Sequence, residues 1–212
     1  MLFGLEPDKF IVTVEVVPPA GPDAESTINA LESLASLPFD GFSVATNPVA
    51  KPRMSALALS VLIQQRTRRP SILHVTTRDH NFLSVQGLLW GARALGIGTV
   101  LVATGDFVAL GDRARATTVR DVDVFGLVRM AREAGLHTGV VLDPHPESDG
   151  LERAIHRLEG KVEAGAQFAV TQPVYGGASA GALADATRHL NIPIILGILP
   201  LRTARHAEFL HH

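Results

Sequence analysis

Cysteine is absent from the 212-residue sequence, which excludes disulfides, thiolate metal sites and cysteine nucleophiles. The sequence also has no large excess of one charge, because it contains 19 lysines and arginines and 21 aspartates and glutamates. The net charge of -2 therefore gives no electrostatic reason to expect a nucleic acid or an anionic membrane as a partner. The acids and histidine of DPHPE at 143–147 are held extended by two prolines, so we predict no metal site.

Long apolar runs are missing as well. None approaches the roughly 20 residues that span a bilayer. The first ten residues, MLFGLEPDKF, carry two acids and no long apolar core, which argues against a signal peptide. Since the lack of cysteine also fits a reducing compartment, we expect a cytoplasmic protein without a membrane anchor.

The sequence does contain a high apolar fraction, 46%, arranged in short runs. No low-complexity linker or change of composition divides it, so we expect a single domain over residues 1–212. Runs rich in β-branched residues predict strands at 10–17, 41–46, 71–77, 99–106, 137–143, 167–174 and 193–200. Amphipathic patterns predict helices at 23–36, 53–67, 80–95, 123–134, 149–164 and 178–190.

Strict alternation of strands and helices indicates a parallel sheet with right-handed crossovers. Two closures compete, an open doubly wound sheet and a (β/α)8 barrel. A dinucleotide-binding doubly wound sheet has a G-x-G-x-x-G fingerprint after its first strand, and VVPPAGPD at 16–23 does not match it. The glycine-rich turn YGGASAG at 175–181 comes late in the chain and reads as a flexible turn or a phosphate cradle.

Polar residues within the apolar strands favour the barrel. Alternate side chains of a barrel strand face the lumen, and Thr13 and Glu15 share one face of the first strand while valines occupy the other. His74 and Thr76 pair likewise on the third strand. Further polar residues stand near the ends of the fourth and sixth strands, namely Thr104, Asp106 and Gln172. Barrel enzymes keep their chemistry at the carboxyl ends of the strands, so we predict that Glu15 points into a site.

Only seven strands are predicted, whereas a (β/α)8 barrel has eight in about 250 residues. The segment HAEFLHH at 206–212 falls inside the expected seventh helix. We therefore predict a barrel that lacks its eighth βα unit, which a continuing chain or a neighbouring chain completes, or which stays open. Unpaired edge strands promote association, so we expect a homo-oligomer.

Each candidate residue also has a simpler explanation. Glu15 is explained equally well as a strand residue turned to water at a sheet edge, and His74 as a core histidine satisfied by a neighbour. Asp106 fits a turn former or a helix cap. Gln172 fits a residue that bonds backbone groups, and Lys161 fits a solvated helix residue. These alternatives stay open on the residues alone.

Several short motifs resemble one known family in their order and spacing. They are VEVVPP at 14–19, ATNPVAKPRMS at 45–55, LHVTTRDHN at 73–81, VLVATGD at 100–106, VRDVDVFGL at 119–127, KVEAGAQFAVTQ at 161–172 and PIILGILP at 193–200. Together they resemble methylenetetrahydrofolate reductase, and more narrowly the reductase domains joined to homocysteine methyltransferases.

The resemblance implies a (β/α)8 barrel that binds FAD at the carboxyl ends of its strands. Such enzymes reduce 5,10-methylenetetrahydrofolate to 5-methyltetrahydrofolate with NADH or NADPH as the hydride donor. It also implies that Glu15 is the catalytic acid, which assists protonation at folate N10, that Asp106 acts near flavin N1 and the pterin ring, and that Gln172 contacts folate. The positions expected to line the flavin are His74, Thr104, Gly105, Asp106, Lys161 and Ala166.

The sequence departs from the family at four positions near the expected cofactor or substrate. At position 45 the family has a threonine and this chain has Ala45, and at position 104 the family has an arginine and this chain has Thr104. Ala154 replaces an acid that contacts the flavin ribose in some members, and Ala204 replaces an aromatic residue. These departures support an alternative, a folate- or pterin-binding barrel without reductase activity that serves methyl transfer or is a degenerate subunit. We also expect an incomplete barrel wall to weaken FAD binding.

Overall fold

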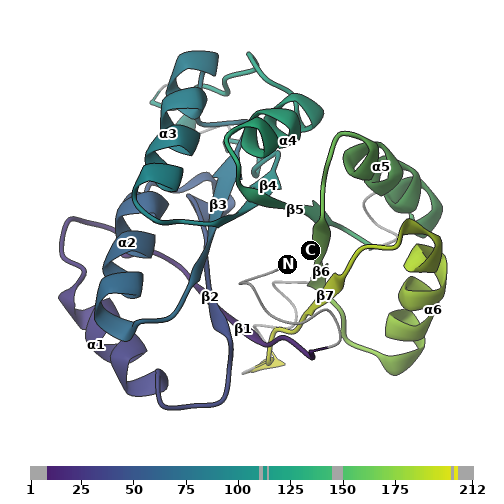
Figure 1. The fold of residues 1–212 in the computed structure, drawn as a ribbon, viewed down its shortest axis with the longest axis horizontal. Helices are drawn as coiled ribbons and strands as arrows, with labels where there is room; N and C mark the ends of the chain where they lie inside the picture. The colour runs from purple at the N-terminus through teal and green to yellow at the C-terminus, as the bar shows by residue number, and fades with distance from the viewer. Residues whose placement is uncertain (1–8, 110–111, 114, 145–149, 202, 205–212) are drawn as a thin grey trace.

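The computed structural model describes residues 9–109, 112–113, 115–144, 150–201 and 203–204. These residues form one sheet of seven parallel strands in sequence order, β1 to β7. A helix connects each strand to the next. Figure 1 shows the sheet curving around a central axis with the helices on its outer side. The alternation in the sequence predicted this arrangement.

The strands are β1 (Thr13–Val16), β2 (Gly41–Val44), β3 (Ser71–Thr76), β4 (Thr99–Ala103), β5 (His137–Leu142), β6 (Phe168–Pro173) and β7 (Ile194–Gly197). The helices are α1 (Glu25–Leu34), α2 (Ala56–Thr67), α3 (Phe82–Ala94), α4 (Val124–Glu133), α5 (Leu151–Glu163) and α6 (Gly177–Thr187), with short 3-10 turns η2 (Pro48–Ala50) and η4 (Arg188–Leu190). Each predicted strand and helix is confirmed, and most are shorter than predicted. The segment 206–212, which is expected to lie inside a seventh helix, is outside the described residues.

Polar caps and glycines fix the helix ends. The Asn81 side chain accepts a hydrogen bond from the Ser84 amide at 2.8 Å and so caps α3. Asp79, two residues earlier, belongs instead to a polar network described below. Gly96 (φ 82°) and Gly135 (φ 75°) adopt the left-handed conformation where helices turn back into strands.

Apolar side chains pack on both faces of the sheet. On the outer face, strand residues such as Val44 and Val75 join the helices in the main core. On the inner face, Ile72, Leu101 and Phe168 form a smaller cluster near the amino ends of their strands. These three side chains pack together across β3, β4 and β6.

Gly139→Ala is expected to lower the free energy of unfolding by about 1–3 kcal/mol, because overpacking forces neighbours out of place. A Cβ at Gly139 would lie 2.2 Å from the Phe168 ring, which itself stacks on His137 at 5.3 Å between centroids. The matched control is Gly87→Ala in α3, where a Cβ meets nothing within 4 Å and alanine favours the helix. Urea unfolding compares the two variants, and equal stabilities would show that the Phe168 ring has room to move.

Strands β1 and β7 form the two edges of the sheet, and neither has an outer partner among the described residues. Apolar side chains beside these edges are accessible, with Leu196 41% and Ile198 80% exposed. A curved sheet of seven strands with two free edges is a (β/α)8 barrel that lacks one βα unit. The prediction of the fold class is thus confirmed.

Candidate active site

Six predicted site residues lie in the carboxyl-terminal part of a strand or directly after it: Glu15 on β1, His74 on β3, Thr104, Gly105 and Asp106 after β4, and Gln172 on β6. Because the strands are parallel, these positions meet at one end of the barrel. Val14 and Val16 pack with the helix-side core, so Glu15 between them alternates onto the inner face. The structure therefore brings these six residues to the same barrel end.

The carboxyl group of Glu15 has no hydrogen-bond or ion-pair partner among the described residues. Desolvation by the surrounding protein raises its pKa above the ordinary value of 4.5. The Glu15 side chain also keeps access to solvent, since the residue is exposed. This access to solvent limits the size of the shift. A carboxyl group with a raised pKa and no competing partner is suited to act as an acid.

His74 is held by Ser43, a residue that the sequence reasoning missed. The His74 Nε2 and Ser43 Oγ atoms are 2.7 Å apart, and Ser43 is the register partner of Glu15 on the neighbouring strand. Three polar residues from adjacent strands thus form a row on the inner face. Burial lowers the pKa of His74 to about 4, so its ring is neutral at neutral pH.

His74 is expected to make the chain less stable as the pH falls from about 6.5 to about 4. The unfolded chain binds a proton at this histidine near pH 6.5, whereas burial delays protonation in the native state to a pKa of about 4. The free energy contributed by the neutral ring is therefore present above pH 6.5 and is lost across this interval. Urea unfolding at several pH values should show a shallower dependence for His74→Asn. Burial also lowers the pKa of His137 to about 4, so this residue contributes the same pH dependence of stability in wild type and in His74→Asn. Equal slopes would contradict the expectation.

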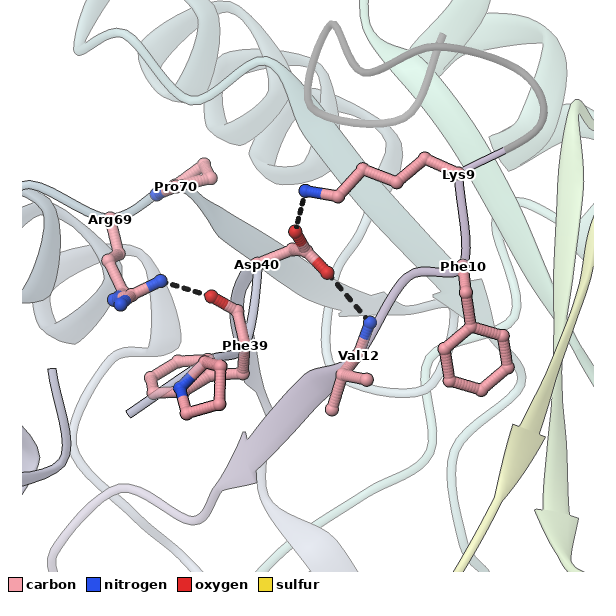
Figure 2. Close-up of a pocket in the computed structure, with 8 residues that line it drawn as sticks. Lys9, Phe10, Val12, Phe39, Asp40, Arg69 and Pro70 are labelled. Carbon is pink, nitrogen blue, oxygen red and sulfur yellow. Dashed lines mark hydrogen bonds and ion pairs between the residues drawn. The ribbon is translucent and has the colours of Figure 1, made fainter. Parts of the chain in front are cut away.

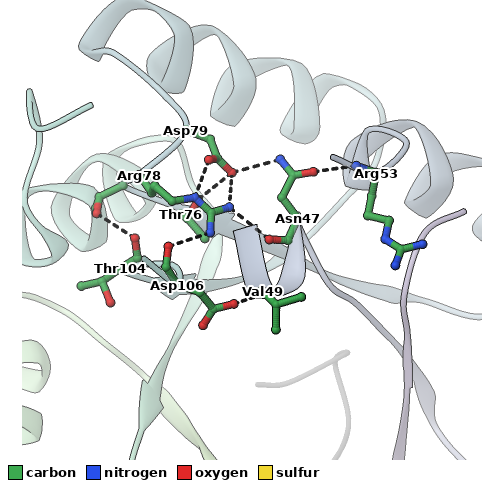
Figure 3. A network of polar contacts seen from close by, with 9 residues as sticks. Asn47, Val49, Arg53, Thr76, Arg78, Asp79, Thr104 and Asp106 are labelled. Atoms are coloured by element: carbon green, nitrogen blue, oxygen red, sulfur yellow. Dashed lines mark hydrogen bonds and ion pairs between the residues drawn. The ribbon is translucent and has the colours of Figure 1, made fainter. Parts of the chain in front are cut away.

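A polar network joins the loops that follow β2, β3 and β4 (Figure 3). Its centre is Arg78, which is only 4% exposed. The guanidinium donates two bonds to the Asp79 carboxylate, at 2.6 and 2.7 Å. It also donates to the main-chain oxygen of Asp106 at 3.0 Å and to that of Asn47 at 3.2 Å. One side chain thereby fixes three loops around the end of the barrel.

The Asp106 carboxylate bonds the loop after β2, because it accepts a hydrogen bond from the Val49 amide. Val49 (φ 49°) and Asn47 (φ 40°) are both left-handed, a conformation that costs a β-branched residue about 1–3 kcal/mol. The Asn47 side chain donates to Asp79 at 3.1 Å and accepts from the Arg53 amide at 2.9 Å. These bonds hold the loop in its strained form next to Asp106.

The structure does not bring Lys161 and Ala166 into the group formed by Glu15 and Asp106. Ala166 precedes β6, at the opposite end of that strand from its carboxyl end, and is 5% exposed within the helix-side core. Lys161 lies in the last turn of α5, and its ammonium group donates to the Val141 carbonyl at 2.7 Å. Burial lowers the pKa of Lys161. The roles of Lys161 and Ala166 toward a flavin stay predictions that rest on the family resemblance.

A cavity of about 660 Å³ opens at the amino-terminal end of the barrel, opposite the predicted site (Figure 2). It exceeds the cavities of about 540, 430 and 300 Å³ beside the loops at the carboxyl ends, so cavity size does not favour the predicted site. Its polar groups, however, already bond one another. Asp40 pairs with Lys9 and accepts from the Val12 amide at 2.9 Å, and Arg69 donates to carbonyls that include that of Ala35. These bonds make the cavity a structural junction.

No helix in the described part of the chain is both long and apolar enough to cross a membrane. No group of three or more histidines, aspartates or glutamates within that part of the chain has an arrangement that could hold a metal ion. Of the DPHPE segment, His145, Pro146 and Glu147 lie outside the described residues.

Comparison with known proteins places this barrel in a family. The family model for methylenetetrahydrofolate reductase matches residues 4–212. The chain belongs to the methylenetetrahydrofolate reductase family. It is 24% identical over 197 residues to the 5,10-methylenetetrahydrofolate reductase of Buchnera aphidicola subsp. Schizaphis graminum, covering 92% of this chain and 66% of that protein. It is 24% identical over 200 residues to the Salmonella typhimurium enzyme of the same name, covering 93% and 67%.

Similar solved structures share the fold. A protein from Clostridium thermocellum that binds two copies of 5-methyl-5,6,7,8-tetrahydrofolic acid has a TM-score of 0.64 and 16% identity, covering 88% of this chain and 65% of that one. A mutant tryptophan synthase α-subunit from Pyrococcus furiosus has a TM-score of 0.60 and 15% identity, covering 95% and 83%. This chain spans about two thirds of the length of the curated relatives that it matches.

Proposed function

We propose that this chain carries the reductase chemistry of its family, the reduction of 5,10-methylenetetrahydrofolate to 5-methyltetrahydrofolate with NADH or NADPH as the donor. The observation that supports this proposal best is Glu15. It is an unpaired carboxyl group of raised pKa on the inner face of β1, in a chain that matches the family over residues 4–212. The proposal also includes a homo-oligomer, which the free edges of β1 and β7 support. It keeps the cytoplasmic location that the sequence led us to expect.

In this proposal Glu15 donates its proton to folate N10, which opens the five-membered ring and leaves an iminium at the one-carbon unit. Desolvation raises the pKa of Glu15 and so favours the protonated form that this step needs. FAD, when bound, supplies the hydride that the iminium accepts. Asp106 orients the pterin ring beside the cofactor, and Gln172 bonds the folate from β6. The neutral His74, fixed by Ser43, offers its other ring nitrogen to the bound molecules.

The residues fit FAD in part. His74, Thr104, Gly105 and Asp106 gather at one barrel end, and Gly105 (φ 84°) lets the chain pass closely over Thr76, since a Cβ there would meet the Thr76 Cβ at 3.1 Å. Lys161 and Ala166 lie away from this group. That observation supports a second candidate, a folate-binding barrel that performs no reduction.

Two titrations of the 212-residue chain separate the candidates. Flavin absorbance during titration with FAD reports cofactor binding, and NADH or NADPH oxidation with methylenetetrahydrofolate reports reduction. Saturable FAD binding with folate-dependent oxidation of NADH or NADPH supports the reductase. Binding of 5-methyltetrahydrofolate without FAD binding or oxidation supports the second candidate, and absence of all three overturns both.

A further inference from the structure

Helix α3 carries apolar side chains on the face that it turns to solvent as well as on the face that packs on the sheet. The buried side is formed by Val85, Leu89 and Ala92. On the opposite side, Leu83 is 78% and Trp90 63% exposed. Figure 1 shows α3 at the periphery of the molecule. A helix that is apolar all round is normally covered all round, so its outward face calls for a partner.

The outward face has the spacing of a coiled-coil seam. Leu83, Gly87, Trp90 and Ala94 follow one another at intervals of four, three and four residues, so they lie in one line along the helix. All four are exposed. Residue size alternates along this line, because the side chains at 83 and 90 are large and those at 87 and 94 are small. These four residues are called the α3 seam below.

A second copy of the same helix fits the α3 seam when it runs antiparallel. A two-fold axis that passes between residues 88 and 89 brings Leu83 opposite Ala94 of the second copy, and Gly87 opposite Trp90 of the second copy. Each large side chain then meets a small one, as close packing requires. A parallel pair would instead place Trp90 against Trp90 and Gly87 against Gly87. The alternation of size therefore selects the antiparallel orientation.

Charge favours the same orientation. Arg93, in the last turn of α3, is exposed and has no hydrogen-bond or ion-pair partner among the described residues. The antiparallel pair brings it to the height of Ser84 of the second copy, near the start of that helix. There the Asp121 carboxylate accepts a hydrogen bond from the Phe82 amide at 3.3 Å. Antiparallel helix dipoles also attract one another.

A cavity of about 540 Å³ adjoins the start of α3 and offers room for the incoming Arg93 side chain. Its charged lining residues are Arg120, Asp121, Asp123, Arg129 and Glu133. Carboxylates outnumber guanidinium groups in this lining, so a further arginine from a second copy finds an opposite charge there.

We propose that the chain forms a two-fold dimer through the α3 seam, with the two α3 helices antiparallel. This surface is separate from the free edges of β1 and β7, and the dimer does not depend on the proposed reduction. One pair of helices of this length buries less than the roughly 1,200–2,000 Å² of a standard interface, so we expect a Kd of about micromolar size. Since α3 lies on the outer side of the sheet, the dimer leaves the carboxyl ends of the strands open.

Sedimentation velocity of the 212-residue chain between about 1 and 300 µM brackets that affinity and should show a shift from monomer to dimer. Trp90 is the single tryptophan of the sequence, so its fluorescence reports on the α3 seam. Its emission should move to shorter wavelength over the same range, because the dimer removes the ring from water. Trp90→Ala should weaken dimerisation about 30-fold, the effect of losing an interface hot spot.

Gly87→Leu fills the space opposite Trp90 of the second copy and should weaken dimerisation about 10-fold or more. It spares the monomer, because a Cβ at Gly87 meets nothing within 4 Å. Gly87→Leu/Trp90→Ala exchanges the large and the small side chain and should dimerise more tightly than either single variant. The matched control is Gly181→Leu on α6, where a Cβ also meets nothing within 4 Å, and it should dimerise like wild type.

Wild type that stays monomeric over the whole range overturns the proposal. Dimerisation that Gly87→Leu does not weaken also overturns it and assigns the contact to another surface, such as the sheet edges. A double variant that dimerises no better than the single ones overturns the antiparallel arrangement. Circular dichroism checks the fold of each variant. If Gly87→Leu does not fold, Trp90→Ala and Arg93→Glu decide, since weaker dimerisation of both supports the proposal and unchanged dimerisation of either overturns it.

Discussion

Glu15→Gln is expected to slow the reduction of methylenetetrahydrofolate by about 10²–10⁴-fold, the usual contribution of a general acid. Glutamine keeps the size and polarity of the side chain but has no acidic proton to give to N10. Reduction of bound flavin by NADH or NADPH needs no proton at N10, so that half-reaction should proceed at nearly the wild-type rate. The expected result is thus a selective loss of one half-reaction.

Stopped-flow absorbance measures both half-reactions on the same flavin-loaded protein. Glu163→Gln, at the exposed end of α5, is the matched control and should leave both rates unchanged. Equal slowing of the two half-reactions by Glu15→Gln would identify Glu15 as a structural residue. Slowing of neither would assign the acid to another group.

The fold was predictable because its signals are local. Runs of β-branched residues alternate with amphipathic segments, and that order alone indicates parallel strands with crossover helices. The inward direction of Glu15 was predictable for the same reason, since side chains alternate along a strand whose other face is lined by valines. Asp106 and Gln172 follow from their places at strand ends. The positions of these three residues could therefore be predicted from their neighbours in the sequence.

The rest of the site depends on contacts between distant segments. Ser43 meets His74 across 31 positions, and Arg78 reaches Asn47 and Asp106 through main-chain oxygens, which no side-chain pattern reveals. The only sequence signals were a serine inside a buried strand and an arginine–aspartate pair in a family motif. For Ala166, the position along the strand and the family resemblance point to different ends of the barrel. Its assignment came from resemblance, while its place before β6 puts it at the other end of the strand.

Arg78→Met is expected to lower the free energy of unfolding by about 3–5 kcal/mol, the cost of breaking a buried ion pair by removing one partner. Arg78 is 4% and Asp79 23% exposed. Desolvation tends to raise the pKa of Asp79, but bonds from Arg78, Asn47 and Thr76 outweigh it and lower that pKa below 3.8. Without Arg78, the carboxylate stays half-buried with neutral donors only, and the loops after β2 and β4 lose their common anchor.

Urea unfolding of four proteins isolates this effect. Arg78→Met/Asp79→Asn should be less destabilised than Arg78→Met alone, because the second change removes the uncompensated charge. Arg188→Met breaks an exposed ion pair with Asp185 and should cost under about 1 kcal/mol. The deficit of Arg78→Met should also shrink as the pH falls toward and below 3.8. The stabilisation of ionised Asp79 by Arg78 is present above that pH and is lost as the carboxylate takes up a proton. A deficit no larger than that of Arg188→Met, or one independent of pH, would mean that the three loops hold their positions without this ion pair.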